Sequence, residues 1–280
     1  MSLPGYRTPD RLQARIALHE RFGPNAKDFH HVQFDHVLRT LGERRGPIAV
    51  LEVGVGTGRL WDSNAERVPA AWDLTLTDAS AGMVEEAGRM LERTGLSGRA
   101  AQVDASDLPF DDAAFDLVVA NHMLYHVPDI ARTVAELRRV LKPDGWLYAA
   151  TNGAEHLAAL RVPMRELAKL APELQVDGTG PLRFELENGG DFLRAAFAEV
   201  ERIDRFDELL VTELEPLMAY LWSVVHLPEA AAPDLEERVR RWDVATRDRF
   251  AKVLETGPVR VGRAAGFFVA HGKSHGRADG

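Results

Sequence analysis

The chain has 280 residues, which is enough for one or two domains of ordinary size. Its net charge of −9 argues against a protein that binds a phosphate backbone, because such proteins need clustered cations. Cysteine is absent, which excludes disulfides, thiolate metal sites and a cysteine nucleophile. With 45% hydrophobic and 28% charged residues, the composition is that of a globular protein without a membrane span. We expect a cytoplasmic protein, and the excess of Arg over Lys is typical of a GC-rich bacterial genome.

The segment before residue 48 is predicted to form two helices. Apolar side chains recur at helical spacing in residues 12–22 and again in residues 29–41. A Gly-Pro pair at 23–24 ends the first pattern, and Gly42 ends the second.

Strand and helix patterns alternate between residues 48 and 151. The apolar, β-branched runs predict strands over 48–53, 74–78, 99–103, 115–120 and 146–151. Amphipathic patterns predict intervening helices over 59–67, 81–93 and 130–141, followed by a turn over 142–145. This alternation predicts an α/β fold with a doubly wound, mostly parallel sheet that carries helices on both faces.

The alternation becomes less regular after residue 151. We expect strands over 199–206, 209–211 and 266–270, and a loop over 172–181. The predicted helices cover 155–170, a short segment ending at 197, 215–225 and 235–254.

A glycine-rich loop follows the first strand and carries the most information. Gly54, Gly56 and Gly58 stand between a buried strand and a helix, where the backbone can approach a ligand closely. The dinucleotide fingerprint requires a glycine where this chain has Arg59, which weakens a reading as an NAD site. The glycine loop is not a phosphate-binding P-loop either, because no Gly-Lys-Ser/Thr sequence follows it.

Three acidic residues stand at the carboxyl ends of neighbouring predicted strands. Glu52 ends the first, Asp78 the second and Asp104 the third. Because these ends converge on one crevice of an α/β sheet, the carboxylates should lie around the same ligand. They would repel a pyrophosphate, and they suit a ligand with a ribose, an amine and a positive sulfur.

Five stretches together resemble the class I S-adenosylmethionine-dependent methyltransferases, in the branch similar to ubiquinone/menaquinone-biosynthesis methyltransferases. They are residues 51–58, 77–80, 103–110, 115–122 and 136–146. The resemblance implies a Rossmann-like, seven-stranded sheet that binds S-adenosyl-L-methionine and releases S-adenosyl-L-homocysteine. It also implies four segments: an N-terminal helical lid (1–45), the cofactor-binding core (46–152), the rest of the sheet with an inserted helical substrate cap (153–270) and a flexible tail (271–280).

The resemblance assigns roles around the methionine and ribose parts of the cofactor. The three loop glycines would let the backbone pass under the methionine part, and Glu52 would help to hold that loop and the cofactor's amine. Asp78 would bind the ribose hydroxyls, with Ala79 and Met83 nearby.

Further roles concern the adenine and the amino-acid end. Asp104 would accept a hydrogen bond from the adenine amino group, and Ala105 would supply a backbone N–H. The carbonyl of Asn121 would lie near the cofactor's amine. Tyr6 or Arg15, in an N-terminal helix, would meet the cofactor's carboxylate, for which an arginine is a bidentate partner.

The expected reaction is an in-line displacement, which depends mainly on alignment and on the exclusion of water. A base is needed only if the acceptor must lose a proton, and His122 is the candidate for that catalytic role. His126 matches a structural feature of the branch. No set of side chains has the spacing of a metal site.

The partner expected from the sequence is a small, fairly apolar acceptor, methylated on oxygen, nitrogen or carbon. Nucleic acid and membrane are not expected as partners, and a homodimer stays open. Three alternatives remain: an NAD-dependent oxidoreductase, a protein that only binds the cofactor, and an enzyme that uses the same pocket for other chemistry, such as a cyclisation.

Overall fold

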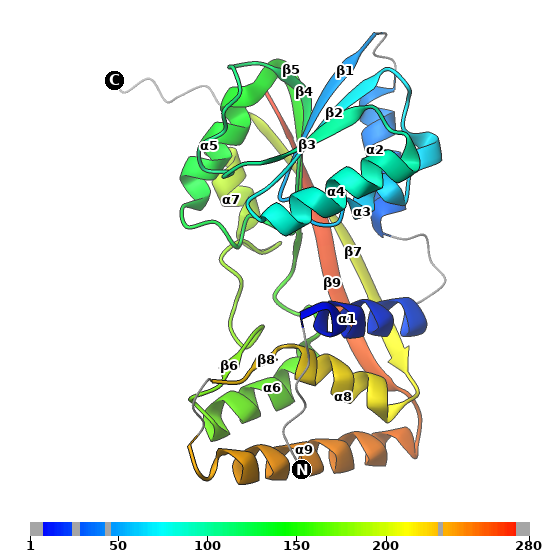
Figure 1. Cartoon of the computed structure of the whole chain (residues 1–280), viewed down its shortest axis with the longest axis vertical. Helices are drawn as coiled ribbons and strands as arrows, with labels where there is room; N and C mark the ends of the chain where they lie inside the picture. The colour runs from blue at the N-terminus through cyan, green and yellow to red at the C-terminus, as the bar shows by residue number, and fades with distance from the viewer. Residues whose placement is uncertain (1–7, 24–28, 43–45, 229–231, 273–280) are drawn as a thin grey trace. The chain divides into compact units, whose positions relative to one another are not determined.

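The computed structural model describes residues 8–23, 29–42, 46–228 and 232–272, and it divides the chain into two compact units. The sheet unit comprises Lys27–Gly153, Arg183–Arg205 and Ala265–Gly280. The helical unit comprises Met1–Ala26, Ala154–Leu182 and Phe206–Ala264. Each unit is considered by itself below (Figure 1).

Within the described residues the sheet unit contains a seven-stranded sheet of order β3-β2-β1-β4-β5-β9-β7. Strands β1 to β5 pair in parallel, whereas β9 pairs antiparallel with β5. The predicted doubly wound, mostly parallel, seven-stranded fold is therefore confirmed. The strands are β1 (Ile48–Val53), β2 (Trp72–Asp78), β3 (Gly98–Gln102), β4 (Phe115–Asn121), β5 (Leu141–Asn152), β7 (Glu199–Val211) and β9 (Val259–His271).

Helices cover both faces of this sheet, because successive residues of each strand point to opposite faces. Val50 of β1 packs into one hydrophobic cluster and its neighbour Leu51 into the other. The first cluster is shared with α2 (Phe29–Leu41), α3 (Arg59–Asp62) and α4 (Ala81–Thr94), and the second with α5 (Ile130–Val140) and α7 (Gly189–Arg194). Figure 1 shows the two groups of helices on opposite sides of the sheet.

The helical unit has its own hydrophobic core. It contains α1 (Thr8–Phe22), α6 (Ala158–Leu170), α8 (Leu214–Ser223) and α9 (Leu235–Leu254), together with a short antiparallel pair, β6 (Gln175–Val176) and β8 (Val225–His226). Leu18, Leu160, Leu221 and Trp242 are buried together in this core. The indole N–H of Trp242 donates to the carbonyl of Pro163 at 2.8 Å, which satisfies the polar atom of a buried ring.

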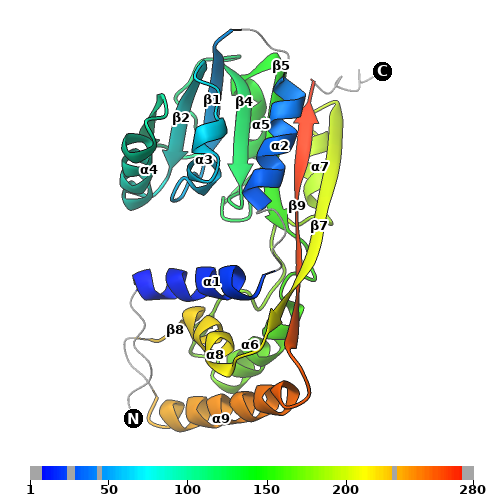
Figure 2. The ribbon, with the colours of Figure 1, turned by 90° about the vertical axis from the view of Figure 1, so that its right-hand side faces the viewer.

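The largest differences from the predicted strand boundaries concern β5, β7 and β9. β7 is continuous where two strands were expected, β9 begins at Val259 rather than 266, and β5 begins at Leu141, inside the expected turn. The charged residues that suggested an interruption of β7 are paired: Asp207 with Arg263, and Glu208 with Arg260. The boundary between the two units falls inside both β7 and β9, which Figure 2 shows as long, oppositely directed strands.

Candidate functional site

The glycine loop joins β1 to α3 and depends on backbone angles that glycine alone adopts readily. Gly54, Gly56 and Gly58 have φ angles of 66°, 56° and 75°. A Cβ atom at Gly54 would lie 2.6 Å from the side chain of Met123, so that glycine also permits close packing. A Cβ atom at Gly56 would meet nothing within 4 Å. The loop therefore leaves open space at its middle glycine, as expected of a cradle for a ligand.

Asp78, at the end of β2, accepts two backbone hydrogen bonds. Its Oδ2 accepts from the N–H of Gly56 at 3.0 Å, and its Oδ1 accepts from the N–H of Ser80 at 2.9 Å. Asp78 thus ties the glycine loop to the turn that contains Ala79 and leads into α4, where Met83 lies in the first turn. A carboxylate has about four acceptor positions, so Asp78 keeps capacity for two hydroxyl groups.

Glu52 is buried in β1 and holds its carboxyl group beside this loop. Its Oε2 accepts from the indole N–H of Trp61 at 2.5 Å, and its own carbonyl accepts from the hydroxyl of Thr77 at 2.9 Å. Burial raises the pKa of Glu52 to about 8; the hydrogen bond from Trp61 opposes the rise, and Asp78 adds to it. The carboxyl group is thus largely protonated at neutral pH until a cation comes close to it.

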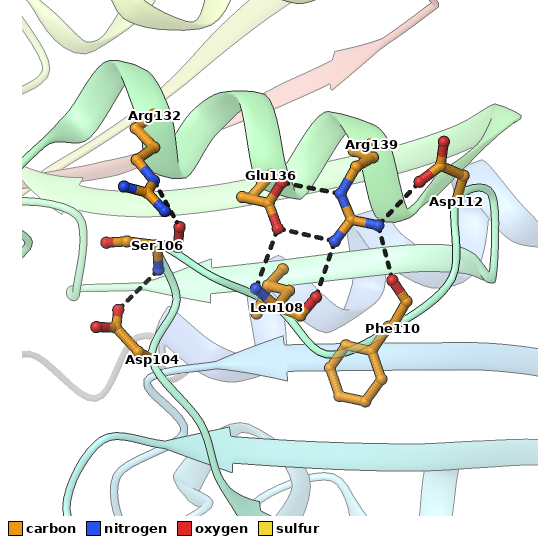
Figure 3. Close-up of polar contacts among 8 residues, drawn as sticks. All are labelled: Asp104, Ser106, Leu108, Phe110, Asp112, Arg132, Glu136 and Arg139. Atoms are coloured by element: carbon orange, nitrogen blue, oxygen red, sulfur yellow. Dashed lines mark hydrogen bonds and ion pairs between the residues drawn. The ribbon is translucent and has the colours of Figure 1, made fainter.

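The segment after β3 carries Asp104 and Ala105. Asp104 is exposed, and its Oδ1 accepts from the N–H of Ser106 at 2.8 Å in a local turn. The side chain of Arg132, on α5, donates to the carbonyl of Ser106 at 3.0 Å (Figure 3). Ala105 is buried within the hydrophobic cluster on that face.

Two further side chains of α5 hold the same segment (Figure 3). Arg139 donates to the carbonyls of Leu108 at 2.8 Å and Phe110 at 2.7 Å, and it pairs with Asp112. Glu136 accepts from the N–H of Leu108 at 3.0 Å, and its hydrogen bond with Arg139 lowers its pKa. Helix α5 therefore fixes residues 104–112 with charged groups, which make stronger hydrogen bonds than neutral ones.

Asn121, the last residue of β4, forms a reciprocal amide pair with Gln33 of α2. The Nε2 of Gln33 donates to Oδ1 of Asn121 at 2.8 Å, and Nδ2 of Asn121 donates to Oε1 of Gln33 at 2.9 Å. Gln33 is fully buried. Neither Gln33 nor Trp61 was predicted from the sequence, although a glutamine among the apolar residues of a helix is a recognisable signal of a buried polar contact.

His122 follows β4 in a left-handed conformation, with φ of 52°, which is uncommon for a residue with a side chain. Its ring centroid lies 5.8 Å from that of Phe29 on α2. Burial lowers the pKa of His122 to about 4, and His30 lowers it further. The imidazole is therefore neutral at physiological pH. His126 instead lies against Tyr125, with ring centroids 4.5 Å apart.

The structure brings most of the predicted site residues to the carboxyl ends of β1, β2, β3 and β4, as the parallel topology requires. They are Glu52, Gly54, Gly56, Gly58, Asp78, Ala79, Met83, Asp104, Ala105, Asn121 and His122. Arg15 belongs to α1 in the helical unit, so its contact with a cofactor stays a prediction. Tyr6 lies outside the described residues.

The residues at these strand ends fit S-adenosylmethionine. The open space at Gly56 admits a ligand, and the acids at 52, 78 and 104 match its cationic and hydroxyl groups. In the part of the chain that the structure describes, no three His, Asp or Glu side chains are gathered as metal ligands. No helix among those residues is long and apolar enough to span a membrane.

Comparisons with known proteins agree with this geometry. A family model described as a methyltransferase domain matches residues 51–149. A malonyl-[acyl-carrier protein] O-methyltransferase of Geobacter sulfurreducens is 34% identical over 219 residues, which cover 77% of this chain and 80% of that protein. The ubiquinone/menaquinone biosynthesis C-methyltransferase of Idiomarina loihiensis is 34% identical over 118 residues, covering 41% of this chain and 47% of that protein.

Solved structures show the same fold. The YcgJ protein from Bacillus subtilis has a TM-score of 0.56 and 20% identity, and the match covers 87% of this chain and 99% of that one. This likeness shows the fold, and the relative from Geobacter sulfurreducens establishes the family. The chain belongs to the class I S-adenosylmethionine-dependent methyltransferases.

Proposed function

We propose that this protein transfers a methyl group from S-adenosyl-L-methionine to a small, fairly apolar acceptor. The observation that carries the proposal is the acid-lined glycine loop, where Glu52 and Asp78 face one cradle that Gly56 leaves open. The names of the relatives support a small acceptor group, since one is named for a malonyl group carried on acyl-carrier protein and another for quinone biosynthesis. The methylated atom is oxygen, nitrogen or carbon, and a bacterial cytoplasm is the proposed setting.

The residues of the loop and its neighbours bind and orient the cofactor in this proposal. Asp78 accepts the ribose hydroxyls at its two remaining acceptor positions, and Asp104 with the N–H of Ala105 holds the adenine. Glu52 ionises beside the cofactor's cationic groups. Asn121 offers its carbonyl to the amine, and Arg15 remains the predicted partner of the carboxylate.

The bound cofactor supplies an activated methyl group on a positive sulfur. A lone pair of the acceptor forms the new bond to the methyl carbon while the carbon–sulfur electron pair returns to sulfur, which yields S-adenosyl-L-homocysteine. The protein contributes alignment and the exclusion of water. His122 is neutral at physiological pH, so a ring nitrogen can accept a hydrogen bond from the acceptor, but its lowered pKa makes it a weaker base than an exposed histidine.

Calorimetric titration of the full chain with S-adenosyl-L-homocysteine tests the cofactor assignment, with NAD as the control ligand. We expect Asp78→Ala to weaken binding by roughly 1.5–3 kcal/mol, the worth of hydrogen bonds to a charged group. Asp73→Ala is the matched control, because Asp73 is an exposed residue at the opposite end of the same strand. Equal affinities of the wild type and Asp78→Ala would remove Asp78 from the site, and binding of NAD alone would favour an oxidoreductase.

The role of His122 is tested by the variant His122→Ala. We expect its affinity for S-adenosyl-L-homocysteine to stay near that of the wild type while methyl transfer slows, if the imidazole takes the acceptor's proton. Equal losses of affinity and turnover would instead make His122 a packing residue. A protein that binds the cofactor but never consumes it with any acceptor would favour a binding protein or other chemistry.

A further inference from the structure

Strand β7 lies at one edge of the seven-stranded sheet. It follows β9 at the end of the strand order, and no strand of the described residues pairs with its outer side (Figure 2). An unpaired edge presents a row of backbone N–H and C=O groups that can pair with a strand of another chain. Natural sheets often keep such edges short, but β7 has 13 residues. It therefore offers a long surface for pairing.

The side chains in the first half of β7 alternate between the two faces of the sheet. Val200 packs against the hydrophobic cluster on the side of α5, and Ile203 packs against the cluster on the side of α2. Alternate residues of a strand share a face, so each face also carries one acid and one base. These are Asp204 and Arg202 on the face of Val200, and Glu201 and Arg205 on the face of Ile203.

The charged groups in this half of β7 are incompletely paired within the chain. No ion pair or side-chain hydrogen bond of Glu201 or Arg205 is found among the described residues. Arg202 pairs with Oδ2 of Asp204 at 2.8 Å, but Oδ1 of Asp204 is buried without a hydrogen bond. By contrast, both acids in the second half of β7 are paired with arginines of β9. Buried acceptors are nearly always satisfied, so a donor from outside the described chain is expected at Asp204.

The sequence of residues 200–206 is complementary to itself. It is Val-Glu-Arg-Ile-Asp-Arg-Phe, in which apolar, acidic and basic residues follow one another in a fixed order. When a second copy runs antiparallel to the first, each acid stands opposite a base and each apolar residue stands opposite an apolar one. Cross-strand pairs of these two kinds stabilise a sheet.

The pairing is centred on Ile203, which stands opposite Ile203 of the second copy. Arg202 then stands opposite Asp204, and Glu201 stands opposite Arg205. Members of each pair are separated by an even number of residues, so they lie on the same face of the joined sheet. Both kinds of ion pair occur twice, because a twofold axis relates the two copies.

The apolar residues at the ends of this segment also meet. Phe206, the next residue along β7, is 67% exposed, which is unusual for a large apolar side chain in a strand. In the antiparallel pairing it stands opposite Val200 of the second copy, on the face where Val200 already packs. The pairing therefore covers an exposed ring as well as the backbone edge.

Other registers and the other edge lack this complementarity. A twofold axis through Arg202, Asp204 or Arg205 would place that charge against itself, and like charges directly opposite each other are destabilising. The opposite edge strand, β3, carries one charged residue, Arg99, and has no acid to pair with it.

We propose that two copies of this protein associate through β7, with residues 200–206 paired antiparallel across a twofold axis at Ile203. Both copies use the same strand, so the contact closes and leaves neither β7 edge open. Arg202 of the second copy supplies the donor that Oδ1 of Asp204 lacks. The proposal is independent of the proposed function, because none of these residues belongs to the cofactor site.

Sedimentation velocity of the full chain over a series of protein concentrations tests the interface. We expect a reversible equilibrium between monomer and dimer. Arg205→Glu replaces both copies of one ion pair by like charges, so it should raise the dissociation constant of the dimer about tenfold or more. Arg99→Glu makes the same change on the opposite edge strand and is the matched control, which should leave the dimer unaffected.

Exchanging the two charges distinguishes a direct pairing from the loss of a side chain. Glu201→Arg should weaken the dimer as Arg205→Glu does, and it remains informative if Arg205→Glu fails to fold. The chain that carries both substitutions should recover the affinity of the wild type, because acid and base again stand opposite each other. A double variant that melts like the wild type in dilute solution but dimerises as weakly as the single variants would overturn the proposal.

Hydrogen exchange shows whether the strand edge itself is covered in the dimer. Alternate amides of an edge strand point away from its neighbour, so exchange over 200–206 should slow as the protein concentration rises. Exchange over 98–102 in β3 should not change. A dimer without concentration-dependent exchange in β7 uses another surface and would overturn the proposal. A chain that stays monomeric at every concentration, or one that forms open-ended assemblies, would overturn it as well.

Discussion

The carboxyl group of Glu52 is largely protonated at neutral pH in the folded protein. Burial in β1 raises its pKa to about 8, and Trp61 donates to it through a short hydrogen bond. A cationic ligand would stabilise the ionised form instead, so ligand binding and proton release should be coupled at this one side chain.

The pH dependence of stability should reveal this group. Because the pKa of Glu52 is raised from 4.5 to about 8, its contribution to the free energy of unfolding is complete below pH 4.5 and is lost as the pH rises to about 8. The free energy of unfolding falls by at most about 1.4 kcal/mol per pH unit over this range. We expect Glu52→Gln to flatten the decline of the unfolding free energy measured with urea between pH 5 and 8. Parallel curves for the two proteins would contradict the raised pKa.

Cofactor binding should show the opposite trend with pH. We expect the affinity of the wild type for S-adenosyl-L-methionine to increase as the pH rises towards 8, because the cation binds the ionised carboxylate better. Glu52→Gln should bind more weakly and lose this dependence. Calorimetry at several pH values measures the affinities of both proteins. Proton uptake instead of release when the wild type binds the cofactor would contradict the coupling between binding and ionisation of Glu52.

Gln33 forms two hydrogen bonds with the side chain of Asn121, so we treat it as a residue that positions Asn121. We expect Gln33→Ala to lower the affinity for S-adenosyl-L-homocysteine several-fold, because the amide of Asn121 loses both hydrogen bonds and the end of β4 loosens. Gln175→Ala, at an exposed position, is the control. Restoring an amide with Gln33→Asn should recover part of the affinity, whereas no difference among these proteins would exclude a positioning role.

At the scale of elements, α5 acts as a clamp on the segment that carries Asp104 and Ala105 (Figure 3). We expect Arg139→Ala to raise hydrogen exchange across residues 104–112 and to weaken S-adenosyl-L-homocysteine binding about tenfold, since two carbonyls and two carboxylates lose their common donor. Arg194→Ala, which breaks an exposed pair with Asp191 on α7, should change neither quantity. Unaltered exchange in Arg139→Ala would show that the segment holds its shape by other means.

The sequence predicted the elements whose residues follow a local pattern, such as a continuous apolar run for a buried strand. Continuous apolar runs gave β1 and β4, and strand-end acids with the glycine loop indicated the ligand site. The length of β7 could not be read in the same way, because Asp207 and Glu208 are charged and find their partners, Arg263 and Arg260, only across the fold. The amide pair of Gln33 was missed for the same reason: its partner is far away in the sequence.

At the scale of the whole molecule, two separate hydrophobic cores share the strands β7 and β9. We expect Leu209→Ala, which truncates a fully buried side chain of β7 in the helical core, to cost about 2–5 kcal/mol of stability. Hydrogen exchange should then also increase over 199–205, the part of β7 in the sheet unit. Its neighbour Leu210 is 42% exposed, so Leu210→Ala is the control. Faster exchange confined to the helical unit would show that the cores unfold independently.

The place of β9 in the sheet has a consequence for biosynthesis. β9 lies between β5 and β7, so neither of those strands has its neighbour on that side until residues 259–271 leave the ribosome. Until then β5 exposes an unpaired edge, which is a hazard for aggregation, and β7 has no strand to pair with. A nascent chain stalled before residue 259 should therefore bind chaperones that recognise open strand edges, and it should be released once β9 has been synthesised.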